Sequence, residues 1–309
     1  MDPNPGTTPL VHVVVLNWNG WRDTVHCLAM LRGLTYPRYR VVVVDNGSSD
    51  GSESEIRRAH PDIPLIQTGS NLGFGAGNNI AMQRALSDGA QYIWVLNNDT
   101  QPSPECLTSL ICVMEAVPRL GIVSPVVFNS RTREPEPLNR FPPGLRRPTP
   151  SPDSNQSGFG DMGLELLDTA PGCSMLLRRA LVEELGGFDE RYFHLFEDTD
   201  LCWRAWKSSW LVGRAHRCRI YHRYGASTEH SRPLLLYYML RNLLLFASRA
   251  TGESVGWLLV RQPLLWAWAL GPLFGLRSFR RPAVKLAVLR AVADALRGRR
   301  GRCPTYSPS

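Results

Sequence analysis

Residues 11–46, VHVVVLNWNGWRDTVHCLAMLRGLTYPRYRVVVVDN, decide the fold of this chain. Residues 11–16 and 41–44 are short runs rich in valine, a pattern that is typical of strands buried on both faces of a parallel sheet. Between them, Trp21 to Leu34 carries apolar residues at helical spacing and ends before Tyr36-Pro37. The stretch therefore predicts one βαβ unit.

The alternation of strands and helices continues along the chain. Helices are predicted at 51–59, 76–88, 103–116 and 179–186, and strands at 64–67, 91–96, 121–127 and 168–177. The predicted fold class is therefore α/β, with a mostly parallel, Rossmann-like sheet flanked by helices. Such a sheet binds ligands outside the carboxyl ends of its strands, and Asn17, Asp45 and Asp99 fall there.

Two changes of composition suggest the domain organisation. Residues 131–163 are rich in Pro, Ser and Gly, and we expect a mobile insertion there that covers the acceptor side of a site. Beyond Ser231 the sequence turns to apolar and Arg-rich helices. We therefore expect an α/β domain over residues 1–230 and a basic, membrane-associating helical region over residues 231–309.

Charge is distributed unevenly over the 309 residues, whose net charge is +8. Residues 1–202 carry 16 Lys and Arg against 24 Asp and Glu, whereas residues 203–309 carry 19 against 3. The C-terminal third should therefore meet an anionic, extended partner, either a membrane surface or nucleic acid. We expect no nucleic acid, because no base-stacking motif accompanies the arginines.

The apolar run at residues 255–276 is interrupted by Pro263 and Pro272. Because about twenty uninterrupted apolar residues are needed to cross a bilayer, we expect an interfacial or re-entrant helix pair on an anionic membrane surface. Three tryptophans suit the headgroup boundary: Trp257, Trp266 and Trp268. The alternative is an ordinary helical subdomain with these tryptophans in its core.

The cysteines and the N-terminus indicate the compartment. Seven cysteines without a CxxC pair suggest reduced thiols rather than a disulfide frame or a zinc site. The first residues lack the basic segment and the long apolar run of a signal peptide. We expect a cytoplasmic protein that is peripheral on the inner face of the cell membrane.

Polar residues follow the first two predicted strands. The amides of Asn17 and Asn19 could hydrogen-bond to a flat base. Asp45 begins a Gly- and Ser-rich turn, where a carboxylate can accept from a pyrimidine N–H or a ribose hydroxyl. An ordinary surface turn with a helix N-cap would explain the second cluster equally well.

A glycine-rich segment, NLGFGAGNN at 71–79, precedes a predicted helix and contains Gly75 and Asn78. Its glycines match the dinucleotide fingerprint only loosely, which disfavours a dehydrogenase. Backbone N–H groups at such a helix start can still bind a nucleotide sugar.

Acids occur at two further element ends. Asn97-Asn98-Asp99 closes an apolar strand, and a divalent ion on a diphosphate typically needs only one or two carboxylates. Asp99 supplies one, with Asn97 as a neutral substitute for a second. Glu197-Asp198-Thr199-Asp200 begins an amphipathic helix. Two separated acids suggest a catalytic base and a metal ligand, although acids at a helix start can simply complement its dipole.

Taken together, these motifs over about residues 10–247 resemble the inverting family 2 glycosyltransferases with the GT-A fold, and most closely their bacterial rhamnosyltransferase-like branch. The resemblance implies that Asp45 contacts the nucleotide base, that Asp99 binds Mg²⁺ or Mn²⁺, and that Asp198 is the catalytic base. It also implies that His222 approaches the donor diphosphate and that Arg241 lies near the acceptor side. A core position at a strand end would explain His222 equally well.

The implied reaction is transfer of a sugar from a nucleoside-diphosphate donor, with dTDP-rhamnose favoured, to a glycan or polyprenyl-linked acceptor in envelope polysaccharide synthesis. Asp198 would take the acceptor proton, and His222 or Arg241 would assist the leaving group. Glu197 and Asp200 would raise the proton affinity of the base by like-charge proximity or orient the acceptor.

Two alternatives remain open. A nucleotidyltransferase of sugar phosphates would need a basic, Gly-rich loop after the first strand, and only Arg22 lies near it. A non-catalytic, membrane-associated protein of the same fold would be expected to have lost the acids, yet both key carboxylates are present.

Overall fold

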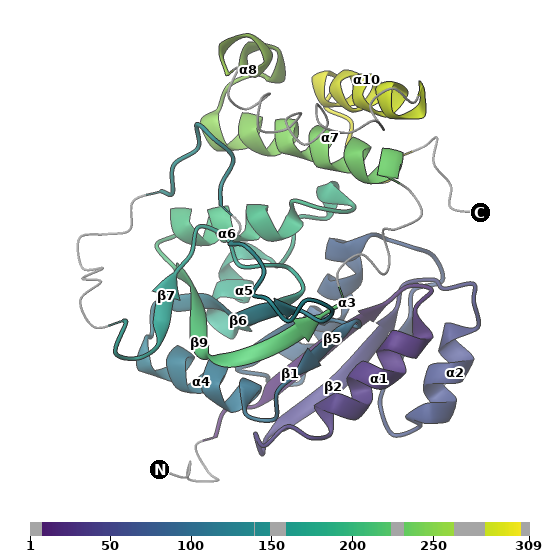
Figure 1. Ribbon diagram of the computed structural model, residues 1–309, viewed down its shortest axis with the longest axis vertical. Coiled ribbons are helices and arrows are strands. Elements are labelled where there is room, and N and C mark those ends of the chain that lie inside the picture. The colour runs from purple at the N-terminus through teal and green to yellow at the C-terminus, as the bar shows by residue number, and fades with distance from the viewer. Residues whose placement is uncertain (1–7, 139, 149–158, 224–231, 263–281, 304–309) are drawn as a thin grey trace.

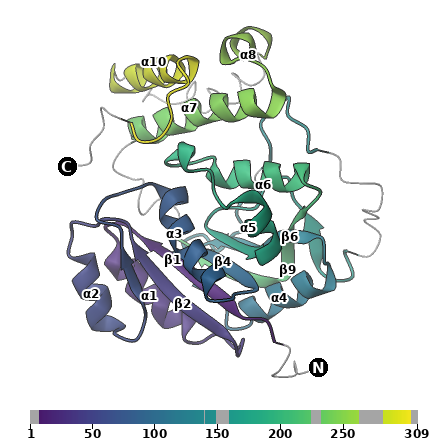
Figure 2. The same ribbon diagram turned by 180° about the vertical axis from the view of Figure 1, so that it is seen from behind.

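The structure is a computed structural model that describes residues 8–138, 140–148, 159–223, 232–262 and 282–303. A nine-stranded sheet crosses the molecule, with helices on both faces (Figures 1 and 2). The α/β prediction is therefore confirmed. The helices are α1 Trp21–Leu31, α2 Ser52–Ala59, α3 Phe74–Ser87, α4 Cys106–Ala116, α5 Arg179–Leu185, α6 Glu197–Lys207, α7 Arg232–Thr251, α8 Val255–Arg261 and α10 Pro282–Leu296, with a 3-10 turn at Glu190–Tyr192.

The strand order is β3-β2-β1-β4-β8-β6-β9-β5, and β7 also pairs with β9. β1 runs parallel to β2 and β4, as the βαβ pattern predicts, but β8 is antiparallel to both β4 and β6, so the sheet is mixed. The strands are β1 Val11–Asn17, β2 Tyr39–Asp45, β3 Leu65–Gln67, β4 Tyr92–Asn97, β5 Thr100–Pro102, β6 Leu120–Asn129, β7 Leu164–Leu166, β8 Ser174–Arg178 and β9 Leu211–His222.

Valine and other apolar residues make β1, β2 and β4 the centre of the core. Every residue from Val11 to Val15 is buried, and Trp94 on β4 is fully buried. α1, α2 and α4 lie on one face of the sheet, and α3, α5 and α6 lie on the other. Burial on both faces explains why these strands read as continuous apolar runs.

Two predictions about strands were incomplete. The predicted strand 168–177 is a loop up to Cys173, and only Ser174–Arg178 forms β8. Pro171 in that loop has no backbone N–H for a sheet ladder. The twelve-residue β9 was not predicted as a whole, and its end places His222 opposite Thr100 of β5.

Part of the insertion 131–163 packs against the helices, although residues 131–135 are exposed. Phe141 is buried, and its ring lies 5.1 Å from that of Trp203 on α6 and 6.2 Å from that of Phe246 on α7. Residues 139 and 149–158 of the insertion lie outside the described residues. The predicted mobility stays a prediction.

The helices α7, α8 and α10 lie together at one end of the molecule, beyond α6 (Figure 1). They share a hydrophobic cluster that includes Leu240 and Leu244 of α7 and Ala287 and Ala291 of α10. No single helix of the described ranges is long and apolar enough to span a membrane, although α7 and α8, bent by 94°, pass that test as a pair. Most of the predicted interfacial segment, residues 263–276, lies outside the described ranges.

All seven cysteines are free thiols, and all but Cys112 are buried. Burial of six of the thiols agrees with the predicted reduced state, which stays a prediction.

Gly73, at the start of α3, allows a close approach to the backbone of Phe193. Its φ of 92° and ψ of 171° are open essentially to glycine alone, and a Cβ there would lie 2.3 Å from the Phe193 carbonyl oxygen. We expect Gly73→Ala to lower the free energy of unfolding by about 2–5 kcal/mol, since backbone strain and overpacking add. Urea unfolding measures this loss.

Gly89→Ala is the matched control, because Gly89 has a φ of 80° but no atom within 4 Å of the added Cβ. It should cost only about 1–2 kcal/mol. Equal losses for the two variants would contradict the importance of the Phe193 contact.

Candidate active site

Asn17 joins the ends of three strands. Its side chain is fully buried, and Nδ2 donates to Asp45 Oδ2 at 2.9 Å and to Ser48 Oγ at 3.1 Å. Its Oδ1 accepts from Thr24 Oγ1 at 2.7 Å and from Asn98 Nδ2 at 3.4 Å. The ends of β1, β2 and β4 are thereby fixed relative to one another.

Asp45 is also fully buried at the end of β2. Its Oδ1 accepts from the Ser48 backbone N–H at 2.8 Å and from Gln67 Nε2 at 3.2 Å. Asn19 lies across this turn with a φ of 51°, and its Oδ1 accepts from the Ser49 N–H at 2.8 Å. The carboxylate holds the turn in shape, while its predicted contact with a nucleotide base stays a prediction.

The glycine-rich helix start packs against the acidic helix. Gly75 lies so close to α6 that a Cβ there would be 3.1 Å from Phe188 Cβ and 3.8 Å from Glu197 Cβ. Asn78 donates to the Phe74 carbonyl at 2.9 Å, and its Oδ1 is buried without a hydrogen-bond partner in the described structure. α3 is therefore a close neighbour of the predicted base.

His222 lies between two carboxylates. Its Nε2 is 3.3 Å from Asp99 Oδ1, and its Nδ1 is 3.2 Å from Glu136 Oε1. Burial disfavours the imidazolium, but the two carboxylates outweigh burial and raise the pKa of His222 to about 9. His222 is also buried at the end of β9, so the alternative of a core position at a strand end agrees with the structure too, with two carboxylates as its neighbours.

Asp99 has the environment that a divalent ion needs. Its Oδ1 is buried, and although His222 Nε2 lies within ion-pair distance, no aligned hydrogen bond reaches it. Among the described residues no group of three His, Cys, Asp or Glu side chains could hold a metal. One carboxylate nevertheless suffices for an ion whose other ligands are diphosphate oxygens and water. The residues present therefore fit such an ion.

Asn97 takes part through its backbone. Its N–H donates to the Cys173 carbonyl at 2.9 Å, and its carbonyl accepts from Thr100 Oγ1 at 2.6 Å. Asn98, which the sequence analysis did not single out, donates to Thr24 Oγ1 at 2.9 Å and belongs to the Asn17 network. Asn98 thus anchors the loop that carries Asp99.

Asp198 lies in the first turn of α6 and is held by backbone donors. Its Oδ2 accepts from the Gly172 N–H at 3.0 Å, and its Oδ1 accepts from the Thr199 N–H at 2.6 Å. Burial raises the pKa of Asp198, and these hydrogen bonds oppose the rise. The carboxyl group is thus kept in one orientation with an increased affinity for a proton.

Glu197 is buried beside it, and its Oε2 has no hydrogen-bond partner among the described residues. Burial raises the pKa of Glu197 well above its usual value, and the charge of Asp198 adds to this. Burial is the largest cause of the raised pKa of Asp198, while the expected contribution of Glu197 and Asp200 to its proton affinity stays a prediction.

Asp200 does not face a substrate. Its carboxylate is fully buried, with Arg204 Nε 2.7 Å from one oxygen and Arg249 Nη1 2.8 Å from the other. Its predicted role in orienting the acceptor is therefore wrong, since it ties α6 to α7 instead.

Arg241 lies in the interior of the C-terminal helices. Its Nη1 donates to the Gly301 carbonyl at 2.8 Å and to Tyr237 Oη at 3.3 Å, and its Nε donates to Asn242 Oδ1 at 2.9 Å. The guanidinium carbon lies 5.0 Å from the ring centre of Tyr238. Contact of Arg241 with a substrate stays a prediction.

Asn242 holds the loop in front of Glu197. Its Nδ2 donates to the carbonyls of His194 and Leu195, both at 2.8 Å. Leu195 and Phe196 have φ values of 68° and 75°, a left-handed conformation that side chains other than glycine rarely adopt. The amide therefore stabilises a strained turn that the sequence does not reveal, because it depends on a helix about fifty residues away.

The predicted acids converge on one residue, Cys173. Burial raises the pKa of its thiol well above the usual value, and the carboxylates of Glu136, Asp99 and Asp198 add to the rise. Asp99 and Asp198 therefore both lie near the start of β8, at the carboxyl end of β4. Glu136 and Gly172 were not predicted as site residues. Of the two, only Gly172 has a sequence signal, because it lies in the turn Pro171-Gly172-Cys173.

Comparisons with known proteins show which family the chain belongs to. The sequence model described as Glycosyl transferase family 2 matches residues 12–186. N-acetylglucosaminyl-diphospho-decaprenol L-rhamnosyltransferase of Mycobacterium tuberculosis is 27% identical over 250 residues, which are 72% of this chain and 78% of that protein. The low-salt glycan biosynthesis hexosyltransferase Agl10 of Haloferax volcanii is 25% identical over 81% of this chain and 83% of its own length.

Solved structures share the fold. The mannosyltransferase PcManGT of Pyrobaculum calidifontis, in complex with GDP-Man and Mn²⁺, has a TM-score of 0.57 at 20% identity, over 94% of this chain and 77% of that one. S. aureus TarS in complex with UDP-GlcNAc has a TM-score of 0.59 at 16% identity, over 93% of this chain and 81% of that one. Since the family match covers more than half of the chain, this protein belongs to glycosyl transferase family 2 and is a glycosyltransferase with the GT-A fold.

Proposed function

We propose that the protein transfers a sugar, with rhamnose favoured, from a nucleoside-diphosphate donor to a hydroxyl of a glycan or polyprenyl-linked acceptor, with inversion at the anomeric carbon. The observation that carries the proposal is that both acids lie at the start of β8: Asp198 accepts from the Gly172 N–H at 3.0 Å, and Asn97, two residues before Asp99, donates to the Cys173 carbonyl at 2.9 Å. One carboxylate can thereby serve the acceptor while the other serves the diphosphate.

The relatives support the choice of substrates. The mycobacterial relative is named as a rhamnosyltransferase of a decaprenyl-diphosphate acceptor, and the haloarchaeal one as a glycan hexosyltransferase. The solved neighbours hold GDP-Man or UDP-GlcNAc. We therefore favour dTDP-rhamnose as donor and a lipid-linked sugar of envelope polysaccharide synthesis as acceptor.

In the proposed reaction, an acceptor oxygen attacks the anomeric carbon from the face opposite the diphosphate. The new C–O bond forms as the bond to the diphosphate oxygen breaks, and the acceptor proton passes to Asp198. Its pKa, raised by burial, brings the carboxylate closer to the pH at which a general base works best. The nucleoside diphosphate leaves with the electron pair of the broken bond.

Asp99 is the residue that would hold Mg²⁺ or Mn²⁺ against the donor diphosphate, and His222, which its pKa of about 9 keeps protonated at neutral pH, would face the phosphates as a cation. Such an ion supplies charge stabilisation for the leaving group. The Mn²⁺ in two solved neighbours, PcManGT and GalNAc-T7, supports this assignment. Glu136 binds the other ring nitrogen of His222, and it would therefore orient the imidazole.

Asn242 is proposed as a positioning residue for the base. It acts through the carbonyls of His194 and Leu195, directly before the turn that presents Glu197 and Asp198. Loss of both hydrogen bonds would free the left-handed turn and with it the direction of the Asp198 carboxylate.

The outer surface of α8 and α10 is proposed to bind the membrane. These two helices are the outermost layer at their end of the molecule (Figure 2). Five of the eight exposed large apolar side chains found in the described ranges lie on them: Trp257, Val260, Leu286, Leu289 and Leu296. Exposed apolar side chains that gather on one surface are typical of lipid binding, whereas single ones scattered over a protein are not.

Charge supports an anionic lipid surface. Exposed basic residues lie on or directly after the same helices: Arg261, Lys285, Arg297, Arg299, Arg300 and Arg302. Each contributes about 1 kcal/mol near an anionic leaflet. Because the cytoplasmic leaflet carries that negative potential, we propose peripheral attachment to the inner face of the cell membrane.

The base assignment is tested with Asp198→Asn. We expect the rate of transfer from dTDP-rhamnose to N-acetylglucosaminyl-diphospho-polyprenol to fall about 10²–10⁴-fold, because the general base is lost. For the wild type, kcat/KM should decline as pH falls through the raised pKa of Asp198, so the acid limb should lie above the usual carboxyl value of 3.8. Product NMR should show an inverted anomeric centre.

Asp62→Asn is the control, since Asp62 is an exposed ion-pair partner of Arg32 remote from the site. The assignment is refuted if Asp198→Asn keeps more than a tenth of the wild-type rate while it binds the donor normally.

The positioning role is tested with Asn242→Ala. We expect kcat to fall at least tenfold with little change in the KM of the donor, because the base is displaced and the nucleotide half is not. Stability should also fall by about 1–3 kcal/mol, since buried carbonyls lose their donor.

Ser248→Ala on the same helix is the matched control, because Ser248 donates to the Glu253 carbonyl in the turn toward α8. An equal loss of kcat in both variants, or a rise in donor KM without a loss of kcat, would show that Asn242 has no specific role in positioning the base.

Membrane binding is tested by co-sedimentation with phosphatidylglycerol vesicles. We expect Val260→Asp with Leu289→Asp to weaken vesicle binding at least tenfold, since each exposed apolar side chain contributes about 1.5–3 kcal/mol when it enters the lipid. Met30→Asp, at an apolar side chain of α1 with 39% exposure, should bind as the wild type does. Unchanged sedimentation of the double variant would exclude this face as the attachment surface.

A further inference from the structure

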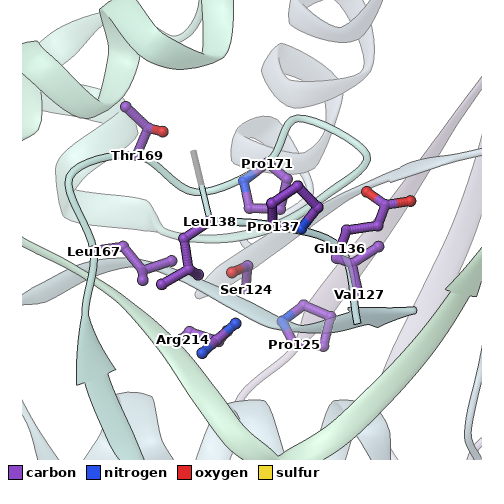
Figure 3. A pocket seen from close by; sticks show the side chains of 10 residues that line it. All are labelled: Ser124, Pro125, Val127, Glu136, Pro137, Leu138, Leu167, Thr169, Pro171 and Arg214. Atoms are coloured by element: carbon purple, nitrogen blue, oxygen red, sulfur yellow. The ribbon is translucent and has the colours of Figure 1, made fainter. Parts of the chain in front are cut away.

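A small cavity of about 40 Å³ lies beside the proposed active site (Figure 3). Its walls come from β6, from β9 and from two loops, at residues 136–138 and 167–171. Ser124 of β6 and Arg214 of β9 are partners in the register of the parallel pair, so their side chains lie on the same face of the sheet. The two loops close over that face.

Three polar atoms of the lining residues have no hydrogen-bond partner among the described residues. They are Ser124 Oγ, Thr169 Oγ1 and Arg214 Nε. Ser124 is fully buried and Thr169 is 1% exposed. Because buried polar groups are nearly always hydrogen-bonded, these atoms indicate a ligand or ordered water in the cavity.

The cavity adjoins both halves of the proposed chemistry. Pro171 lines it, and the next residue, Gly172, donates to Asp198 Oδ2 at 3.0 Å. Glu136 also lines it and contacts His222 at 3.2 Å. The cavity is therefore connected to Asp198 through Gly172 and to His222 through Glu136.

The lining selects a neutral group that carries hydroxyls. Arg214 is already paired with Glu165 at 2.6 Å, and Glu136 adds a carboxylate, so there is no excess positive charge for a phosphate. Apolar walls from Pro125, Leu138 and Leu167 face the hydroxyls. Apolar surface combined with a few fixed hydrogen-bonding groups is the chemistry of a sugar edge.

We propose that this cavity is a subsite for the acceptor, which binds a hydroxyl or acetamido substituent of the acceptor sugar through Ser124 and Thr169. The inference rests on the proposed glycosyl transfer. It assigns acceptor recognition to β6 and to the 167–171 loop, which carry none of the proposed catalytic or metal-binding residues.

The test combines Ser124→Ala and Thr169→Val. We expect the acceptor KM for N-acetylglucosaminyl-diphospho-polyprenol to rise about tenfold for each hydroxyl removed, with donor Kd and acceptor-independent donor hydrolysis unchanged. The melting temperature should stay the same or rise, because neither hydroxyl has a partner in the free protein. Ser87→Ala, at an exposed hydroxyl that donates to the Gln83 carbonyl, is the control.

An acceptor KM within twofold of the wild-type value in the double variant would overturn the subsite. A lower melting temperature with an unchanged KM would also overturn it, because the hydroxyls would then bind only structural water. Saturation-transfer NMR with methyl N-acetylglucosaminide gives a readout that needs no transfer. Loss of its signal in the double variant would support the subsite, and an unchanged signal would overturn it. Absence of transfer by the wild type with every donor would instead refute the proposed function.

Discussion

The proposed donor half of the site depends on the hydrogen bonds of the buried Asn17 carboxamide. It has no exposed surface, and it uses both ends, donating to Asp45 and accepting from Thr24. A buried polar network of this kind is worth most when every member is satisfied, and a single unpaired member is costly. The ends of β1, β2 and β4 therefore form one rigid frame, and Asp99 is carried on a loop that leaves this frame through Asn98.

The base is held in a different way. α6 begins with two residues in the left-handed region, Leu195 and Phe196, and such a backbone persists only when its surroundings determine it. Part of that determination comes from Asn242, and part from the ion pairs of Asp200 with Arg204 and Arg249. The sheet thus fixes Asp99, the proposed metal ligand, whereas the C-terminal helices help to fix Asp198, the proposed base. The proposed catalytic geometry would therefore require the two parts of the chain to pack together.

The sequence predicted the features that depend on local pattern. Continuous valine runs gave β1 and β2, and polar residues at element ends gave Asp99 and Asp198 as neighbours in space. The direction of a strand and the partners of a side chain could not be predicted from local pattern in the same way. The apolar run Ser174–Arg178 reads alike in a parallel and an antiparallel strand, so the reversal of β8 left no trace. Glu136 lies in an irregular segment without periodicity, so its contact with His222 was missed. Asp200 was misassigned although its spacing of four residues from Arg204 is typical of a helical ion pair.

α7 connects the surface features of the molecule with its chemistry. One part of this helix carries Asn242 and Arg249, which hold α6, while its contacts with α8 and α10 support the proposed lipid-binding layer. A lipid-linked acceptor would arrive along the membrane, so its reactive hydroxyl would approach from the end of the molecule where these helices lie. Because α7 is in contact with both the layer and the loop before Asp198, the proposed membrane attachment and the orientation of the proposed base would depend on the same element. A soluble substrate would not need that arrangement, whereas a membrane-bound one would gain a fixed distance between its lipid anchor and the Asp198 carboxylate.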